Sequence, residues 1–134
     1  MAGGDDRTGL QASRLIALRE AHRDLDAAIE AGRAEGRPIL VDFSADWCTE
    51  CRLMERTVLA DGNVRRRLNG VRLIRADVTR YDAQSRSIMK RFAVVGPPTL
   101  IFLNPMGTEV EGARTVGATV ADDFLAKIAA AERG

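Results

Sequence analysis

The chain has 134 residues, 46% of them hydrophobic, which is enough for one compact domain that buries its own core without disulfide support. The 20 basic and 19 acidic side chains leave a net charge of +1, which argues against a nucleic-acid surface; the one dense basic run, Arg65–Arg67, is typical of a solvated helix end. No apolar stretch approaches the roughly 20 residues that cross a bilayer, and Met1–Leu10 is unlike a signal peptide. We therefore expect a soluble chain, which is cytosolic, exported and mature, or a domain of a longer protein.

The N-terminal part of the sequence predicts a flexible lead-in followed by a helix. Met1–Gly9 is polar and Gly-rich, and residues 10–134 are expected to form a single domain. Apolar side chains then recur at intervals of three and four, which predicts a helix ending near Gly32 or Gly36: Leu15, Leu18, His22, Leu25 and Ile29. His22 lies on or beside this stripe, where a packed or partly exposed histidine is expected rather than a functional one.

Strand and helix patterns then alternate. The run Ile39–Phe43 after Pro38 predicts a strand covered on both faces, and Cys48–Leu59 predicts a helix. A break at Asp61-Gly62 precedes a short helical continuation over Val64–Leu68.

The second half of the chain continues the alternation. Val71–Val78 predicts a strand and Ala83–Phe92 a helix. Gly96-Pro97-Pro98 interrupts the pattern before Thr99–Leu103, whose β-branched and aromatic side chains favour a strand.

Turn chemistry marks the region after this strand. Asn104–Gly107 predicts a turn, and Glu109–Gly112 a short strand that forms a hairpin with the preceding one. A last helix is expected from Val120 to Ala131, with three apolar side chains facing inward: Phe124, Leu125 and Ile128.

The only two cysteines, Cys48 and Cys51, lie where a hydrophobic run gives way to a helical pattern. A helix N-terminus carries partial positive charge, which favours a thiolate over a thiol. Cys48 is therefore the expected exposed attacking group. Cys51, one turn further on, would release the substrate from a mixed disulfide on Cys48 by intramolecular exchange.

The two cysteines have three alternative uses. A structural disulfide over three residues closes so small a loop that it restricts the unfolded chain very little. A zinc site usually needs four ligands, and with two cysteines and the distant His22 it would have to be shared between chains. A copper(I) site with two thiolates is chemically reasonable, because soft ligands select that ion.

The order of elements and two motifs resemble the thioredoxin superfamily over nearly the whole chain. The motifs are Val41–Cys51, which ends in Cys-Thr-Glu-Cys, and Gly96-Pro97-Pro98-Thr99 ahead of a strand. Within the superfamily, the sequence is most similar to the C-terminal periplasmic domain of the DsbD family of thiol:disulfide interchange proteins, on Ala45–Cys48, Glu55, Ala76–Thr79 and Pro98–Phe102. This resemblance implies an α/β thioredoxin fold, with a central mixed β-sheet flanked by helices and an N-terminal helical extension.

The resemblance also implies roles for two carboxylates. Asp42 has only apolar neighbours in its strand, so burial should raise its pKa and make it a base for Cys51; the alternative is an Asp at a strand end that caps the next helix. Glu55, four residues after Cys51 on the same helix face, could approach the inner sulfur together with Asp42. The alternative for Glu55 is a surface pair with Arg52.

Substrate binding is expected at Trp47 and at Gly96, Pro97 and Pro98. Trp47 could shield the disulfide and offer an apolar docking surface, or it could simply belong to the core. Pro98 matches the position of the cis-proline that thioredoxin-like proteins place opposite the disulfide. Pro97 before it has no N–H to donate, so only its carbonyl remains for a bound substrate strand.

The resemblance implies a protein-disulfide reductase that passes electrons through Cys48 and Cys51. The donor would be a membrane-embedded cysteine pair and the acceptor a second periplasmic domain. The chain would be a monomer and the periplasmic C-terminal domain of a DsbD-like inner-membrane protein, or exported, with no metal and no cofactor besides its redox-active disulfide. Thr49-Glu50 replaces the Gly-Pro of thioredoxin, and the charge of Glu50 should oppose the thiolate slightly, away from an oxidising role. The alternative is a free-standing thioredoxin-like reductase, which could be cytoplasmic.

Overall fold

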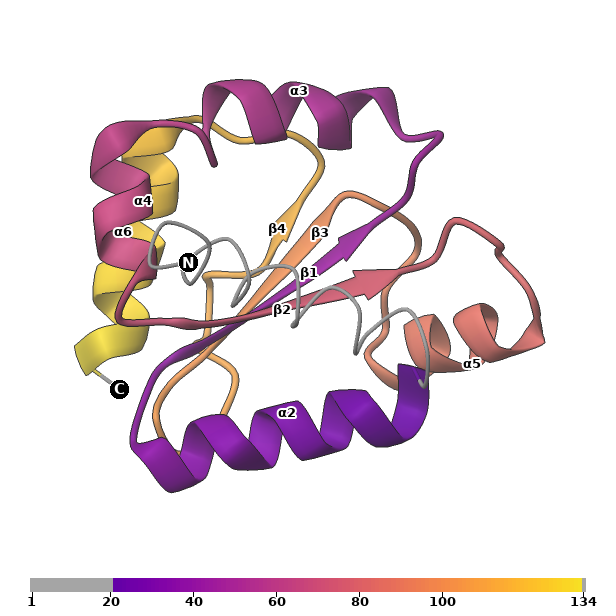
Figure 1. Cartoon of the computed structure of the whole chain (residues 1–134), viewed down its shortest axis with the longest axis horizontal. Coiled ribbons are helices and arrows are strands. Elements are labelled where there is room, and N and C mark those ends of the chain that lie inside the picture. The colour runs from indigo at the N-terminus through magenta and orange to yellow at the C-terminus, as the bar shows by residue number, and fades with distance from the viewer. Residues whose placement is uncertain (1–20, 134) are drawn as a thin grey trace, which may run out of the picture.

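The computed structural model describes residues 21–133 (Figure 1). The expectations for Met1–Gly9, for the start of the first helix and for the side chain of His22 lie outside the described residues and side chains. The helices are α2 (Ala21–Glu35), α3 (Thr49–Thr57), α4 (Gly62–Leu68), α5 (Ala83–Arg91) and α6 (Ala121–Arg133), and the strands are β1 (Ile39–Ser44), β2 (Arg72–Asp77), β3 (Thr99–Leu103) and β4 (Thr115–Val116). None of the described helices is both long enough and apolar enough to cross a bilayer.

A mixed four-stranded sheet with the order β2-β1-β3-β4 forms the centre of the fold. The central strand β1 runs parallel to β2 and antiparallel to β3. Every residue of β1 and β3 is buried, as their continuous apolar runs predict. Helices α2 and α5 cover one face of the sheet, and α3, α4 and α6 cover the other (Figure 1). This is the predicted thioredoxin fold.

Alternation along β1 divides the core between the two faces. Val41 and Phe43 pack in the cluster beneath α2 and α5, where the Phe43 ring lies 5.9 Å from that of Phe92. Leu40 packs in the other cluster, in which Phe102 of β3 meets Phe124 of α6 at 5.7 Å. Because successive side chains of a strand point to opposite faces, Asp42 lies on the same face as Leu40, beneath the helix that begins after Cys48.

The predicted hairpin strand Glu109–Gly112 is wrong. Glu109 forms only an isolated bridge with Leu103, and the Val110 N–H donates to the carbonyl of Phe102 at 2.8 Å. Gly112 then adopts a φ of +79°, a conformation that favours glycine and turns the chain. The strand that pairs with β3 is β4, which lies opposite Thr99 and Leu100.

The expected helix break at Asp61-Gly62 is the start of α4. The Asp61 carboxylate accepts hydrogen bonds from the N–H groups of Asn63 and Val64, at 2.9 and 3.1 Å. We expect Asp61→Ala to lower the free energy of unfolding by about 1 kcal/mol, the usual effect of removing such a cap. Urea denaturation measures this change. The control Glu111→Ala alters an exposed turn residue and should stay within about 0.5 kcal/mol of the parent; equal effects of the two substitutions would contradict the capping role.

Candidate active site

Cys48 and Cys51 form a disulfide at the N-terminus of α3, with their Cα atoms 5.2 Å apart. Cys48 is the N-cap of this helix, and its Sγ accepts a hydrogen bond from the N–H of Cys51 at 3.1 Å. A sulfur at the N-cap accepts a hydrogen bond from a backbone N–H and lies at the positive end of the helix dipole. In the reduced protein the same contacts favour a thiolate on Cys48.

The prediction that Cys48 is exposed is wrong for the disulfide form. Cys48 is 7% exposed and Cys51 is 3% exposed. Both pack into the apolar cluster beneath α2 and α5, together with Ala45 and Val94. The two cysteines are therefore about equally buried. What distinguishes them is that only Cys48 is the N-cap of α3.

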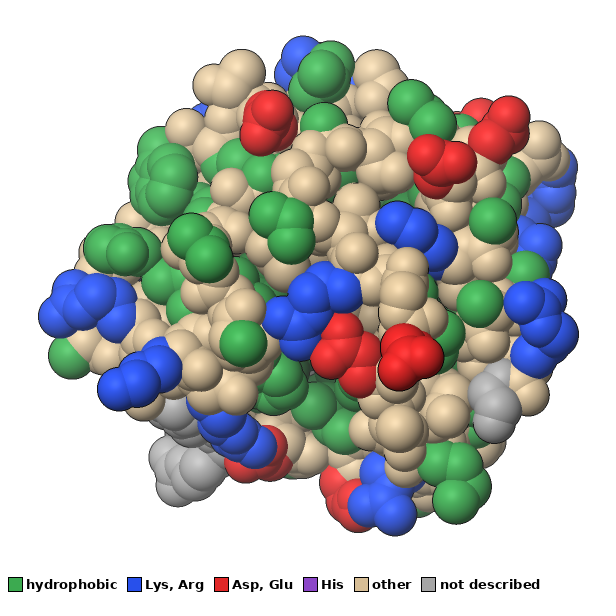
Figure 2. All heavy atoms as spheres, turned by 180° about the vertical axis from the view of Figure 1, so that it is seen from behind, with side chains coloured by type: hydrophobic (Ala, Val, Ile, Leu, Met, Phe, Trp, Pro, Cys, Tyr) green, Lys and Arg blue, Asp and Glu red, His purple; other side chains and the backbone are tan. Residues whose placement is uncertain are grey.

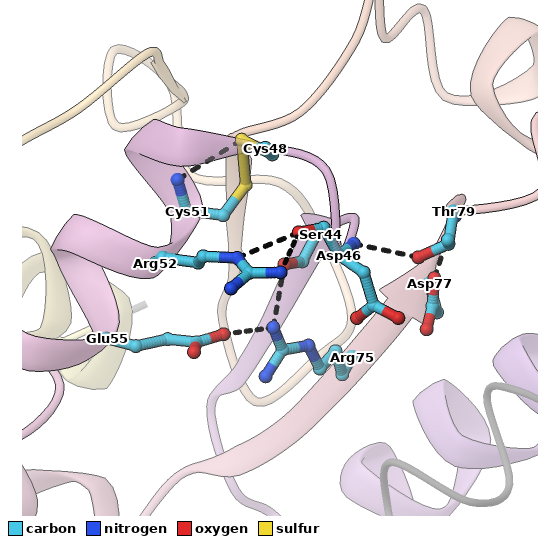
Figure 3. A network of polar contacts seen from close by, with 9 residues as sticks. All are labelled: Ser44, Asp46, Cys48, Cys51, Arg52, Glu55, Arg75, Asp77 and Thr79. Atoms are coloured by element: carbon cyan, nitrogen blue, oxygen red, sulfur yellow. Dashed lines mark hydrogen bonds and ion pairs between the residues drawn. A yellow bond between two sulfur atoms is a disulfide. The ribbon is translucent and has the colours of Figure 1, made fainter.

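Trp47, directly before Cys48, is 57% exposed, so it is not a core residue. Its indole N–H donates to the carbonyl of Thr79 at 2.9 Å, and the N–H of Asp46 donates to the Thr79 hydroxyl at 2.9 Å. On the other side, the Arg52 guanidinium donates twice to the Asp46 carbonyl, at 2.8 and 2.6 Å (Figure 3). These contacts fix the loop that presents Trp47 and Cys48.

Glu55 points away from the sulfurs. Its carboxylate forms an ion pair with Arg75 of β2, and the same guanidinium donates to the Ser44 hydroxyl at 2.7 Å (Figure 3). The alternative pairing of Glu55 with Arg52 is wrong, because Arg52 is directed at the Asp46 carbonyl. Arg75 therefore already balances the negative charge of Glu55, which weakens any electrostatic effect of Glu55 on Cys51.

Asp42 lies within β1 and is 5% exposed. It is in register with Arg75 on one side and with Leu100 on the other. The alternative in which Asp42 caps the following helix is wrong, because that cap is Cys48. Asp42 thus lies on the face of the sheet that α3 covers. Its neighbour on β2 is Arg75, whose side chain pairs with Glu55 of α3.

Gly96, Pro97 and Pro98 form the loop before β3, and the Pro97–Pro98 bond is cis, as predicted. The carbonyl of Gly96 accepts from the Thr99 hydroxyl at 2.6 Å, and that of Pro98 accepts from the N–H of Gly117 at 2.9 Å. Within the described part of the chain, no hydrogen bond reaches the Pro97 carbonyl. Val94, just before this loop, belongs to the same apolar cluster as Cys48 and Cys51.

Exposed apolar side chains come from the segments that meet at this end of the fold. Trp47 precedes Cys48, Val95 precedes Gly96 and is 92% exposed, and Val116 lies in β4 opposite Thr99. Figure 2 shows hydrophobic side chains gathered at the upper left, the side on which α3 begins when Figure 1 is turned by 180°. Among the described residues, no group of three or more His, Cys, Asp or Glu side chains is placed to hold a metal ion.

Three functional candidates were not assigned from the sequence: Thr79, Arg52 as a clamp on Asp46, and Arg75. Thr79 lies two residues after Asp77, whose carboxylate accepts a hydrogen bond from the Thr79 N–H at 2.8 Å. The tendency of Asp to form such an Asx turn was the one local feature of the sequence that pointed to Thr79. Arg75 gave no such signal, because its partners lie on other elements.

Comparisons with known proteins agree with this geometry. A thioredoxin-like family model matches residues 20–105. Thiol:disulfide interchange protein DsbD 2 of Pseudomonas aeruginosa is 46% identical over 103 residues, and DsbD of Ralstonia nicotianae is 43% identical over 105 residues. These matches cover 77% and 78% of this chain but only 18% and 17% of the relatives, so the chain spans less than a fifth of their length.

A solved structure shows the same likeness. The crystal structure of the reduced C-terminal domain of DsbD from Neisseria meningitidis aligns with a TM-score of 0.71 at 26% identity. The alignment covers 82% of this chain and 96% of that domain. The chain is thus similar to a DsbD C-terminal domain over nearly the full extent of that domain.

Proposed function

We propose that this chain, which belongs to the thioredoxin-like family, is a protein-disulfide reductase that passes electrons through Cys48 and Cys51. The observation that carries the proposal is the disulfide at the N-terminus of α3, in which the Cys51 N–H donates to the Cys48 sulfur. The similarity to DsbD proteins supports the same reaction class.

The proposed reaction begins with the reduced protein. The Cys48 thiolate attacks one sulfur of a substrate disulfide, the substrate S–S bond breaks, and the other substrate sulfur leaves as a thiolate. The product is a mixed disulfide between Cys48 and the substrate. The Cys51 thiol then loses its proton, and its thiolate attacks the Cys48 sulfur and displaces the second substrate thiolate. Two electrons pass to the substrate, and the Cys48–Cys51 disulfide forms.

Asp42 is the proposed base for Cys51. It is buried on the face beneath α3, where an ionised carboxylate is poorly solvated and binds a proton more readily than in water. Arg75 in the register position beside it pairs with Glu55, which keeps the second carboxylate of this face neutralised. Asp42 therefore acts on the proton, and Arg75 and Glu55 are positioning residues.

We further propose the place of this chain in an electron relay. By its similarity to the C-terminal domain of DsbD, it would take electrons from a membrane-embedded cysteine pair and pass them to a periplasmic acceptor domain. The exposed side chains of Trp47, Val95 and Val116 would form the surface that both partners contact in turn. A free-standing reductase with broader substrates would use the same surface.

The test is a redox measurement on the whole chain. The purified protein is equilibrated with glutathione and glutathione disulfide mixtures, and the fraction of Cys48–Cys51 disulfide is measured by alkylation and mass spectrometry. We expect a reversible two-electron transition that follows the ratio of the two glutathione forms, and reduction of insulin disulfides by the reduced protein. A pair that stays oxidised in excess thiol and leaves insulin intact would contradict the proposal.

A further inference from the structure

Arg114 hydrogen-bonds to two separate segments: Glu109, after β3, and Phe92-Ala93, at the end of α5 just before the loop of residues 94–97. Its Nε and Nη2 donate to the two carboxylate oxygens of Glu109, at 2.8 and 2.9 Å. Its Nη1 donates to the carbonyls of Phe92 and Ala93, at 2.8 and 3.1 Å. The hydrogen bond to Glu109 is the main reason that the pKa of Arg114 is raised, so its charge is retained. One side chain thus joins the turn after β3 to the C-terminal end of α5.

The carbonyls that Arg114 binds lie where the chain leaves α5. Phe92 is the C-cap of that helix, and its carbonyl lies at the negative end of the helix dipole, where a cation is favoured. Ala93 has a φ of +55°, a left-handed conformation that costs energy for any residue with a Cβ. Bonds to the carbonyls of both residues hold this strained turn, which sends the chain toward Val95.

The segment Arg114–Gly117 holds the loop at both of its ends. Arg114 binds the start of the loop through Phe92 and Ala93, and the Gly117 N–H donates to the Pro98 carbonyl at 2.9 Å. Between these points, β4 pairs with the first residues of β3. The intervening residues 94–97 carry the exposed Val95 side chain and the Pro97 carbonyl, which accepts no hydrogen bond from the described part of the chain.

We propose that Arg114, oriented by Glu109, is a positioning residue for partner binding, because it fixes the loop that presents Val95 and the Pro97 carbonyl to a docked polypeptide. This inference rests on the proposed function. A loop ordered before binding loses less conformational entropy when a partner strand docks. Arg114 touches neither sulfur, so it acts on docking and not on the exchange of electrons between them.

The experiment measures single-turnover oxidation of the reduced full chain, followed by the fluorescence of Trp47, the one tryptophan of the sequence. Insulin serves as the polypeptide disulfide, and dithiobis(nitrobenzoate) as a small disulfide that needs no docking along the loop. We expect Arg114→Met to raise the apparent dissociation constant for insulin about tenfold, which corresponds to about 1.4 kcal/mol. Its limiting rate at saturating insulin, and its rate with the small disulfide, should match the parent.

Two further variants separate positioning from a general loss of structure. Glu109→Gln should raise the dissociation constant less than Arg114→Met, and adding it to Arg114→Met should change nothing more, since Glu109 acts through Arg114. Arg67→Met removes another Arg–Glu pair, with Glu132 at the α4–α6 contact, and should bind insulin like the parent.

An unchanged dissociation constant in Arg114→Met would overturn the inference, as would an equal loss of rate with both disulfides. A parent protein that reacts with neither disulfide would instead refute the proposed function. If Arg114→Met does not fold, Glu109→Gln decides the question alone, and insulin binding equal to the parent would overturn the inference.

Discussion

Cys51→Ala should trap the protein as a mixed disulfide on Cys48, and Cys48→Ala should lower the rate of electron transfer by on the order of a thousandfold or more, the scale of losing a nucleophile. The reason is the division of roles along the first turn of α3. Only the Cys48 sulfur lies at the N-cap and receives the Cys51 N–H, so it is the atom that the helix favours as a thiolate. Without Cys51, no second thiol displaces the substrate.

Mass spectrometry of the products formed with a peptide disulfide identifies the trapped species. Rates of alkylation of the reduced protein test the same assignment independently. Because both cysteines are buried in the disulfide form, we expect faster alkylation of Cys48 to come from its thiolate character and to depend on pH, rather than from exposure alone. Equal alkylation rates of the two cysteines at all pH values would contradict the assignment of Cys48 as the nucleophile. Turnover retained by Cys48→Ala would contradict it as well.

Asp42→Asn should slow resolution of the mixed disulfide by on the order of a hundredfold near neutral pH, within the usual contribution of a general base. The initial attack by Cys48 should slow much less, because that sulfur has the helix N-terminus to stabilise its thiolate. In the variant, the resolution rate should keep rising as the pH increases, since only solvent is left to remove the Cys51 proton. In the parent, it should level off once Asp42 is ionised.

Stopped-flow fluorescence separates the two steps, and NMR follows the carboxyl groups. Arg75 of β2 is in register with Asp42 and forms an ion pair with Glu55 of α3. Burial disfavours the carboxylate form of Asp42, so we expect NMR to show a raised pKa for Asp42 that depends on the redox state of the cysteines. Asp46→Asn is the matched control. Glu55→Gln should slow resolution more weakly than Asp42→Asn. An Asp42 titration in the ordinary range of an aspartate, the same in both redox states, would refute the base assignment.

The sequence predicted those parts of the fold that depend on local pattern. The buried strands β1 and β3 are continuous apolar runs, and their predicted limits agree with the structure to within one residue. β4 was missed because two residues, Thr115 and Val116, carry no periodic signal and pair only through their position beside β3. The sequence predicts a strand that ends at Gly112, where the structure has a turn, because glycine marks a break without specifying the direction of the chain after it.

The candidate site divides in the same way. The sequence indicated Cys48 and Cys51 because their spacing and chemistry are local. The resemblance to thioredoxin-like proteins implied Pro98 and a role for Asp42, whose place in an apolar strand supported that role. The partner of Glu55 could not be predicted from helix spacing, because Arg75 lies 20 residues away on a strand. Arg52 and Thr79 likewise act on Asp46 through contacts that exist only after the chain has folded. The burial of Cys48 is a further tertiary effect, because Cys48 belongs to an apolar cluster whose members come from several elements.

The N-cap hydrogen bond from Cys51 to the Cys48 sulfur couples the redox state of the protein to its folding stability. A thiolate accepts this bond and the helix dipole more strongly than a disulfide sulfur does, so reduction should strengthen the first turn of α3. In a thermodynamic cycle, the difference in unfolding free energy between the reduced and oxidised forms equals the difference in reduction free energy between the folded and unfolded chain. Whatever stabilises the thiolate cap therefore makes the dithiol a weaker electron donor, and the capping geometry of α3 contributes directly to the reduction potential of the pair.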